Sequence, residues 1–461
     1  MSSRFAIVLA AGKGTRMHSS RSKVLHEVGG RSSLQWVIDG ARACGCRTIV
    51  LVVGPDADDL RAALDGQEDL RFVVQEERLG TGHAVQVAVR ALEDEGLEGT
   101  ALVLYGDAPL VRQGTLERLL ATAEAGFGAL SVATLDEPGN LGRVDCAEDG
   151  QLLRIVEVAD ATEADLEIRR VNAGHYALRF PEIVQYLDAL EPANEQGEYY
   201  LTDAVVAAGV DHGVLSVELE DPSEAWGINT RADLARVHGA FGRRAVAEAQ
   251  DAGVTFLQPD TVTVDATVQF GRDVVIHPGV HLLGETRLGE GTVVHAGSWL
   301  RDADVGAGCE VRPYSVIDQS TLADGCGVGP FVRLRGGAEL AEGVHLGNFV
   351  EVKKSNLGSG VKAAHLAYLG DATVGEGSNI GAGVVTCNYD GERKHQTTIG
   401  ERAFVGSDSM LVAPVSVGDG ATTAAGSVVT QDVPADALAV GRARQRNIEN
   451  WRRRRRVKSG E

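Results

Sequence analysis

The sequence is poor in the features that mark secreted, membrane-bound and nucleic-acid-binding proteins. Its six cysteines form no CxxC pair and no disulfide-dense pattern, so we expect a reducing, cytoplasmic location. It has neither an N-terminal signal pattern nor a run of about 18 apolar residues, so we expect no membrane insertion. A formal net charge of −21 argues against nucleic-acid binding. An anionic substrate would therefore need a locally positive pocket. Cys44 and Cys46 could form a thiol pair, but we interpret both as residues near a helix end.

A six-residue repeat occupies the second half of the chain, from about Val262 to Val429. Apolar residues recur there at every sixth position, and one unbroken register consists of Leu322, Val328, Leu334, Leu340, Leu346 and Val352. This period fits neither a helix nor a simple strand, and it predicts a parallel β-helix in which three short strands close each triangular coil. At about 18 residues per coil, about ten coils fit between residues 254 and 437. The alternative, a β-sandwich, would space its strands irregularly.

The first half alternates apolar runs with helical patterns, which predicts a doubly wound, Rossmann-like α/β domain of about 230 residues. Ligands of such sheets bind beyond the carboxyl ends of the strands. The predicted strands cover residues 5–10, 48–53, 71–75, 102–105, 129–134, 152–158, 171–178 and 214–219. We predict helices at 56–64 and from Gly80 to about Glu93.

Two features at predicted strand ends indicate phosphate and metal binding. The first strand runs into Ala11-Gly12-Lys13-Gly14-Thr15-Arg16, a glycine-rich turn that lets backbone N–H groups and the charge of Lys13 or Arg16 face an anion. Asp107 follows another strand, where a carboxylate is suited to Mg²⁺ or, alternatively, to a turn. On spacing alone, Lys23 is a solvated surface charge.

A helical pattern opens at Thr230, where Asp233 is spaced to form a capping pair. We expect residues 231–250 to link an α/β domain, 1–230, to a β-helix domain, 251–461. The latter includes the basic tail Trp451-Arg452 to Arg456, which we interpret as solvated. The alternative is a tail that contacts CoA phosphates or a partner prism.

Several motifs together resemble a known family. They are Leu9-Ala-Ala-Gly-Lys-Gly-Thr-Arg-Met17, Lys23-Val-Leu-His26, Tyr105-Gly-Asp107, Arg333-Leu-Arg335, Gly347-Asn-Phe-Val-Glu351 and Thr386-Cys-Asn-Tyr-Asp-Gly391. With the hexapeptide repeat, they resemble the bacterial bifunctional enzymes that join an N-acetylglucosamine-1-phosphate uridyltransferase to a glucosamine-1-phosphate N-acetyltransferase. The resemblance implies a nucleotidyltransferase domain, a left-handed parallel β-helix, a homotrimer, and the substrates UTP, acetyl-CoA and glucosamine-1-phosphate.

The resemblance also implies residue roles in uridyl transfer. The nucleotide would contact Leu9, Ala10, Ala11 and Gly12, and the uracil Gln75, Gly80 and Thr81; ribose, phosphate and metal would contact Tyr105, Gly106 and Asp107; the sugar would contact Gly142, Glu157 and Asn172. Asp107 and Asn229 would share Mg²⁺, and Arg16 and Lys23 would stabilise the leaving pyrophosphate.

For acetyl transfer, the resemblance implies that His365 is the general base, oriented by Glu351. The sugar phosphate would contact Arg335, Lys353, Tyr368 and Asn379, and acetyl-CoA would contact Ala382, Asn388, Tyr389, Ser407, Ala425 and Arg442. We expect a polar loop at 388–397, where the repeat is interrupted.

Two other functions remain open at this point. One is a single-activity sugar-1-phosphate nucleotidyltransferase whose β-helix only assembles the oligomer, and the other is a regulatory scaffold without catalysis. The histidines at 277, 281, 295 and 345 do not repeat with the spacing of a three-histidine zinc site, so we do not favour a zinc hydratase.

Overall fold

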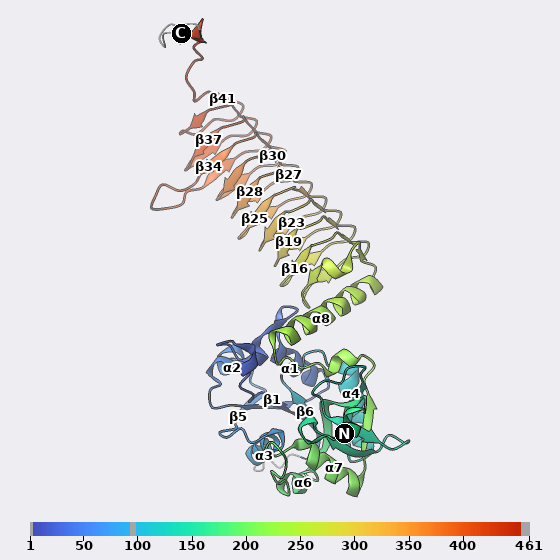
Figure 1. Ribbon diagram of the computed structural model, residues 1–461. Coiled ribbons are helices and arrows are strands. Elements are labelled where there is room, and N and C mark those ends of the chain that lie inside the picture. Colours follow the sequence, from blue (N-terminus) through green and yellow to red (C-terminus); the bar gives the residue numbers. More distant parts are fainter. Residues whose placement is uncertain (1–2, 93–97, 453–461) are drawn as a thin grey trace. The chain divides into compact units, whose positions relative to one another are not determined.

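The computed structural model describes residues 3–92 and 98–452, and the chain divides into two compact units, Met1–Phe241 and Gly242–Glu461 (Figure 1). The division falls within helix α8 (Arg231–Asp251). At its start, the Asp233 N–H donates to Thr230 Oγ1 at 3.1 Å and the Thr230 N–H donates to Asp233 Oδ2 at 2.9 Å. This confirms the predicted capping pair. In the described part of the chain, no helix combines the length and apolar character needed to cross a membrane.

The first unit is built on one mixed sheet with the order β11-β7-β10-β6-β1-β4-β5. Its strands are β1 (Arg4–Leu9), β4 (Thr48–Val53), β5 (Leu70–Val74), β6 (Gly99–Tyr105), β7 (Gly128–Thr134), β10 (Arg170–Phe180) and β11 (Val214–Glu218). Strand β10 runs antiparallel to β6 and β7, while β6, β1, β4 and β5 are parallel. The predicted α/β domain, which we expected to contain a mixed sheet, is therefore confirmed; the sequence did not reveal which strand runs antiparallel.

Helices cover both faces of this sheet because successive strand residues point to opposite sides. Phe5 and Ile7 of β1 pack with α3 (Thr81–Leu92) and α7 (Leu201–His212), whereas Ala6 and Val8 pack with α1 (Ser33–Ala43) and α4 (Gln113–Ala125). The predicted helix near 56–64 is α2 (Asp58–Ala63). Glu93, the expected end of α3, lies outside the described residues. This two-sided burial explains why the strands read as continuous apolar runs.

The two cysteines near α1 are packing residues, as we interpreted them. Cys44 caps the C-terminal end of the helix, and Cys44 and Cys46 are 3% and 4% exposed. Burial raises the pKa of Cys44 to about 11 and that of Cys46 to about 12, so both thiols stay protonated at neutral pH.

The second unit is a left-handed parallel β-helix of short strands stacked in three sheets of 11, 10 and 9 strands. Each strand pairs in parallel with the strand one coil away, as Val311 pairs with Val328 and Val328 with Leu346. The predicted register points into the prism, where its six residues from Leu322 to Val352 are at most 2% exposed. Each coil buries its apolar residues on the next, so the array stabilises itself by repetition.

Candidate functional site

A cavity of about 420 Å³ lies at the carboxyl edge of β1 and β6, where Leu9 pairs with Tyr105. It is lined by Leu9, Ala10, Ala11, Gly12, Lys23, Gln75, Arg78, Gly80, Thr81, Ala84, Tyr105, Asp107, Ala108, Asn140, Leu141, Gly142, Glu157, Asn172, Ala173, Gly174, Glu198, Ala225, Gly227 and Asn229. Of the residues assigned above to uridyl transfer, only Gly106 and Arg16 are absent from this lining. Gly106 lies behind it, where its N–H donates to Leu9 O at 3.0 Å, and Arg16 is exposed in the turn.

The glycine-rich turn after β1 leaves space for a lysine. A Cβ on Gly14, whose φ is +58°, would lie 2.8 Å from Lys23 Cβ, and a Cβ on Gly12 would lie 3.3 Å from Lys23 Cε. Larger residues would therefore displace the Lys23 side chain from the cavity wall. These distances show that the Lys23 side chain lies against the glycine-rich turn. Lys23 is therefore not a free surface charge, contrary to the interpretation from spacing alone.

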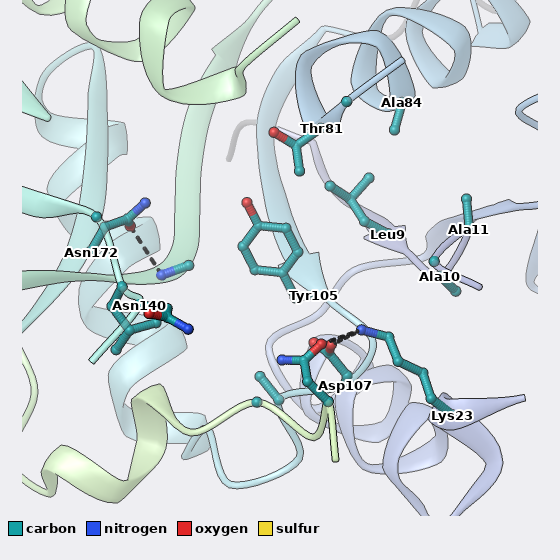
Figure 2. Close-up of a pocket in the computed structure, with 18 of the residues that line it drawn as sticks. Leu9, Ala10, Ala11, Lys23, Thr81, Ala84, Tyr105, Asp107, Asn140 and Asn172 are labelled. Carbon is teal, nitrogen blue, oxygen red and sulfur yellow. Dashed lines mark hydrogen bonds and ion pairs between the residues drawn. The ribbon is translucent and has the colours of Figure 1, made fainter. Parts of the chain in front are cut away.

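Lys23 and Asp107 point toward each other in the cavity (Figure 2), and Asn229 joins them in one polar cluster of its lining. The Lys23 ammonium forms an ion pair with the Asp107 carboxylate and donates to Asn229 Oδ1 at 3.0 Å. Each partner of the ion pair has only 15% of its side chain exposed. Two oxygens from distant parts of the sequence therefore converge on one cation.

The opposite wall carries polar groups held in a largely buried setting. Thr202 Oγ1 donates to Glu157 Oε1 at 3.3 Å, and a Cβ on Gly142 would lie 3.2 Å from Glu157 Oε2. Burial raises the pKa of Glu157 and that of Tyr105. Asn172 is fixed on both sides, because its Nδ2 donates to the Tyr176 hydroxyl at 2.6 Å and its Oδ1 accepts from the Gly174 N–H at 3.0 Å.

Arg78 is a cavity residue that the sequence did not single out. Its Nε donates to the Ala11 carbonyl of the glycine-rich turn, and its Nη2 pairs with Asp56. In Glu76-Glu77-Arg78 it reads as part of an exposed charge run. Only its spacing, two residues before Gly80, could have linked it to the cavity.

A second polar cluster lies on the β-helix, on strands β25 (Arg333–Arg335), β28 (Glu351–Lys353) and β31 (Tyr368–Gly370). Arg335 pairs in register with Lys353, and Glu351 with Tyr368. The Lys394 ammonium, from the loop after β34 (Val385–Cys387), has a lowered pKa because it faces Lys353. The cluster therefore concentrates positive charge on an otherwise acidic protein, and Lys394 is a member that the sequence did not identify.

His365 ends strand β30 (Lys362–His365), and the adjacent coil orients its imidazole. The His365 Nδ1 lies 2.6 Å from Asn348 Oδ1. Glu351 instead accepts from Arg335 Nε at 2.8 Å, so the expectation that Glu351 orients His365 was wrong. Because the amide oxygen of Asn348 can only accept, Nδ1 carries the hydrogen and Nε2 is the nitrogen that can take up a proton.

The predicted acetyl-CoA residues fall along one edge of the prism and in the loop beside it. Ala382, Ser407, Ala425 and Arg442 belong to successive coils: Asp408 N donates to Ala382 O, Gly426 N donates to Ser407 O, and Arg442 Cδ lies 3.8 Å from a Cβ built on Gly426. Asn388 and Tyr389 begin the predicted loop, which leaves the coil between β34 and β35 (Thr397–Ile399). Asn379 lies apart from Arg335 and Lys353, on the sheet where it pairs with Lys362.

The remaining sequence features are accounted for as follows. The rings of His277 and His295 are in contact at a tilt of 42°, with centroids 4.5 Å apart, and His295 Nε2 lies 3.2 Å from Glu310 Oε1. Trp451 is 58% exposed, whereas residues 453–456 of the basic tail lie outside the described residues.

A Rossmann-like sheet with a polar cavity at its carboxyl edge, joined to a hexapeptide β-helix, is typical of a nucleotidyltransferase that carries a second, β-helical domain. Family models agree: residues 6–254 match the MobA-like NTP transferase domain, and residues 396–431 match the hexapeptide repeat of succinyl-transferase. The chain is 43% identical to the bifunctional protein GlmU of Pelobacter propionicus, over 98% of this chain and 99% of that one. It is 44% identical to GlmU of a Nostoc species, over 98% of this chain and 99% of the relative. It is 47% identical to GlmU of an Anaeromyxobacter species, over 98% of this chain and 93% of the relative. The chain belongs to the family of bifunctional GlmU proteins.

Proposed function

We propose that the protein acetylates glucosamine-1-phosphate with acetyl-CoA and then transfers UMP from UTP to the N-acetylglucosamine-1-phosphate formed. The product, UDP-N-acetylglucosamine, is a precursor of peptidoglycan and other cell-envelope polymers. Uridyl transfer belongs to residues 1–230, acetyl transfer to residues 251–461, and 231–250 link the two. The convergence of Asp107, Asn229 and Lys23 in the first cavity is the observation that carries this proposal.

Uridyl transfer needs alignment and charge neutralisation more than acid–base chemistry. A phosphate oxygen of N-acetylglucosamine-1-phosphate bonds to the α-phosphorus of UTP, while the bond from that phosphorus to the β-phosphate oxygen breaks and pyrophosphate leaves. The attacking oxygen is already anionic, so no general base is required. Lys23 and the glycine-rich turn, with Arg16 at its end, neutralise the leaving group, and Glu157 and Asn172 hold the sugar.

The oxygens of Asp107 and Asn229 fit a hard divalent cation, and we assign Mg²⁺ to them. Lys23 supports this assignment, because its ammonium already draws both oxygens toward one positive charge. Mg²⁺ bound there would neutralise phosphate charge and is satisfied by oxygen ligands, several of which come from substrate and water. Among the described residues, no three His, Cys, Asp or Glu side chains come together to hold a metal ion by themselves. A cation at Asp107 and Asn229 would therefore take its remaining ligands from the bound nucleotide and water.

Acetyl transfer needs a base because the amine of glucosamine-1-phosphate is largely protonated at neutral pH. The ammonium form first loses one proton to solvent. His365 Nε2 then takes a proton from the amine nitrogen as that nitrogen bonds to the thioester carbon, and the imidazolium returns it to sulfur as the C–S bond breaks, so that CoA leaves as its thiol. Arg335, Lys353 and Lys394 supply the positive charge for the sugar phosphate. Tyr368 completes that site, and the edge from Ala382 to Arg442 binds acetyl-CoA.

A column of exposed apolar residues beside His365 supports a homotrimer. Tyr314, Phe331 and Phe349 occupy one corner of successive coils, with ring centroids 5.5 and 5.3 Å apart, and Leu366 continues the column. They are between 47% and 62% exposed, and their φ angles lie between 53° and 59°, which bulky residues rarely adopt. Burial against a second prism would remove this apolar surface from water and bring a neighbouring chain close to His365.

We propose that the enzyme is cytoplasmic. A coupled assay tests its proposed function. Glucosamine-1-phosphate, acetyl-CoA, UTP and Mg²⁺ should yield UDP-N-acetylglucosamine, CoA and pyrophosphate. Sugar nucleotide formed only from N-acetylglucosamine-1-phosphate would instead support a single-activity nucleotidyltransferase, and the absence of any turnover would support a non-catalytic scaffold.

A further inference from the structure

The amide of Gln75 is held in one orientation by two acceptors. Gln75 follows β5, is 3% exposed, and donates its backbone N–H to Val53 O at 2.8 Å. Its Nε2 lies 3.1 Å from Gly80 O and 3.0 Å from His83 Nδ1. A carbonyl oxygen can only accept, so the atom that faces Gly80 must be the amide nitrogen. His83 Nδ1 then accepts the second amide hydrogen, and the imidazole carries its own hydrogen on Nε2.

This arrangement leaves only the amide oxygen of Gln75 for a ligand. Both hydrogens of the NH₂ group are used, no donor to Oε1 is found among the described residues, and Gln75 lines the cavity. An acceptor at this position suits a base with a ring N–H, such as uracil at N3. Cytosine carries a lone pair at N3, so it would face the oxygen with an acceptor.

The two groups that hold the amide are themselves fixed. Gly80 has a φ of +108°, and a Cβ there would lie 2.6 Å from Tyr199 O. The Gly82 N–H donates to the same Tyr199 carbonyl at 2.7 Å, which fastens the first turn of α3, and His83 with it, to the chain before α7. A rotated Gln75 amide would direct its oxygen at the Gly80 carbonyl, which can only accept, and would require the His83 imidazole to move its hydrogen from Nε2 to Nδ1.

We propose that His83 is a positioning residue that holds the Gln75 amide in this orientation and thereby makes the cavity select UTP over CTP. The inference rests on the proposed uridyl transfer. His83 acts through Gln75, so its loss changes the preference between bases more than the chemistry common to both. Gly80 remains as the second acceptor, so the preference weakens without vanishing.

Two substitutions in the full-length protein test this role. His83→Leu removes the acceptor, whereas the amide oxygen of His83→Asn can occupy the position of Nδ1. We expect His83→Leu to lower the ratio of kcat/KM for UTP to that for CTP by about tenfold or more, with N-acetylglucosamine-1-phosphate and Mg²⁺ present. His83→Asn should keep the ratio within about threefold of the wild-type value. Acetyl transfer, measured on each preparation, reports whether the protein is folded.

A ratio within about twofold of wild type in His83→Leu would overturn the proposal, as would an equal loss of the ratio in both variants while acetyl transfer persists. The second result would mean that the ring packs rather than accepts. Wild-type protein that transfers no UMP from either nucleotide would contradict the proposed function itself and, with it, this role.

Discussion

Replacing Asp107 separates the two proposed activities within one protein. Asp107→Ala removes one of the two oxygens that converge in the cavity and leaves the Lys23 ammonium with Asn229 Oδ1 at 3.0 Å. Loss of a cation ligand is worth several kcal/mol in the transition state, so we expect uridyl transfer to fall by about 10³-fold or more, which corresponds to about 4 kcal/mol. The ion pair is largely but not fully buried, so the stability cost should be only about 1–2 kcal/mol.

Both activities should be measured on the same preparation: pyrophosphate release with N-acetylglucosamine-1-phosphate and UTP, and CoA release with glucosamine-1-phosphate and acetyl-CoA. Acetyl transfer should stay within about twofold of wild type, because His365 belongs to the other unit. Asp136→Ala is a matched control, since that carboxylate is 96% exposed and, among the described residues, pairs only with the surface residue Arg169. Parallel loss of both activities in a folded Asp107→Ala protein, or uridyl transfer at the wild-type rate, would refute the reasoning.

Three further predictions concern other parts of the molecule. His365→Ala should lower acetyl transfer by about 10²–10⁴-fold and leave pyrophosphate release unchanged, and equal losses in the two assays would contradict its role as base. Phe331→Asp should convert the proposed trimer to smaller species in sedimentation velocity, whereas an unchanged mass would exclude the aromatic column as the contact. His175 is fully buried, which lowers its pKa to about 4, so the unfolded chain binds more protons than the native one between pH 6.5 and 4. The free energy of unfolding should therefore fall by about 2 kcal/mol between pH 7 and 5 because of His175. Urea unfolding at the two pH values should show this loss in the wild type, and His175→Gln should lack it.

The repeat and the alternation of strands were predictable because each depends on a local pattern. A prism buries one residue in six, so Leu322 and its register could be read directly from their spacing. Strand β4 likewise matches its predicted bounds, since a strand buried on both faces reads as one apolar run. The direction of β10 is not encoded in this way, because an apolar strand has the same pattern in either orientation.

Contacts between residues far apart in the chain were harder to predict from the sequence. Lys23 reads as a surface charge until the fold brings it to Asp107, 84 positions away. His365 could be identified by the resemblance, but its partner could not, since only the coil register places Asn348 rather than Glu351 against the imidazole. Arg78 and Lys394 are surrounded by other charged residues, which conceals their roles.

The most direct test of the account mixes two variants, each of which is expected to lack one of the two activities. Asp107→Ala alone, given glucosamine-1-phosphate, acetyl-CoA, UTP and Mg²⁺, should accumulate N-acetylglucosamine-1-phosphate, and His365→Ala alone should leave the sugar phosphate unchanged. Combined in one tube, they should restore UDP-N-acetylglucosamine, as followed by mass spectrometry. A mixture of folded variants that forms no sugar nucleotide would contradict the claim that two separate sites carry out the two reactions.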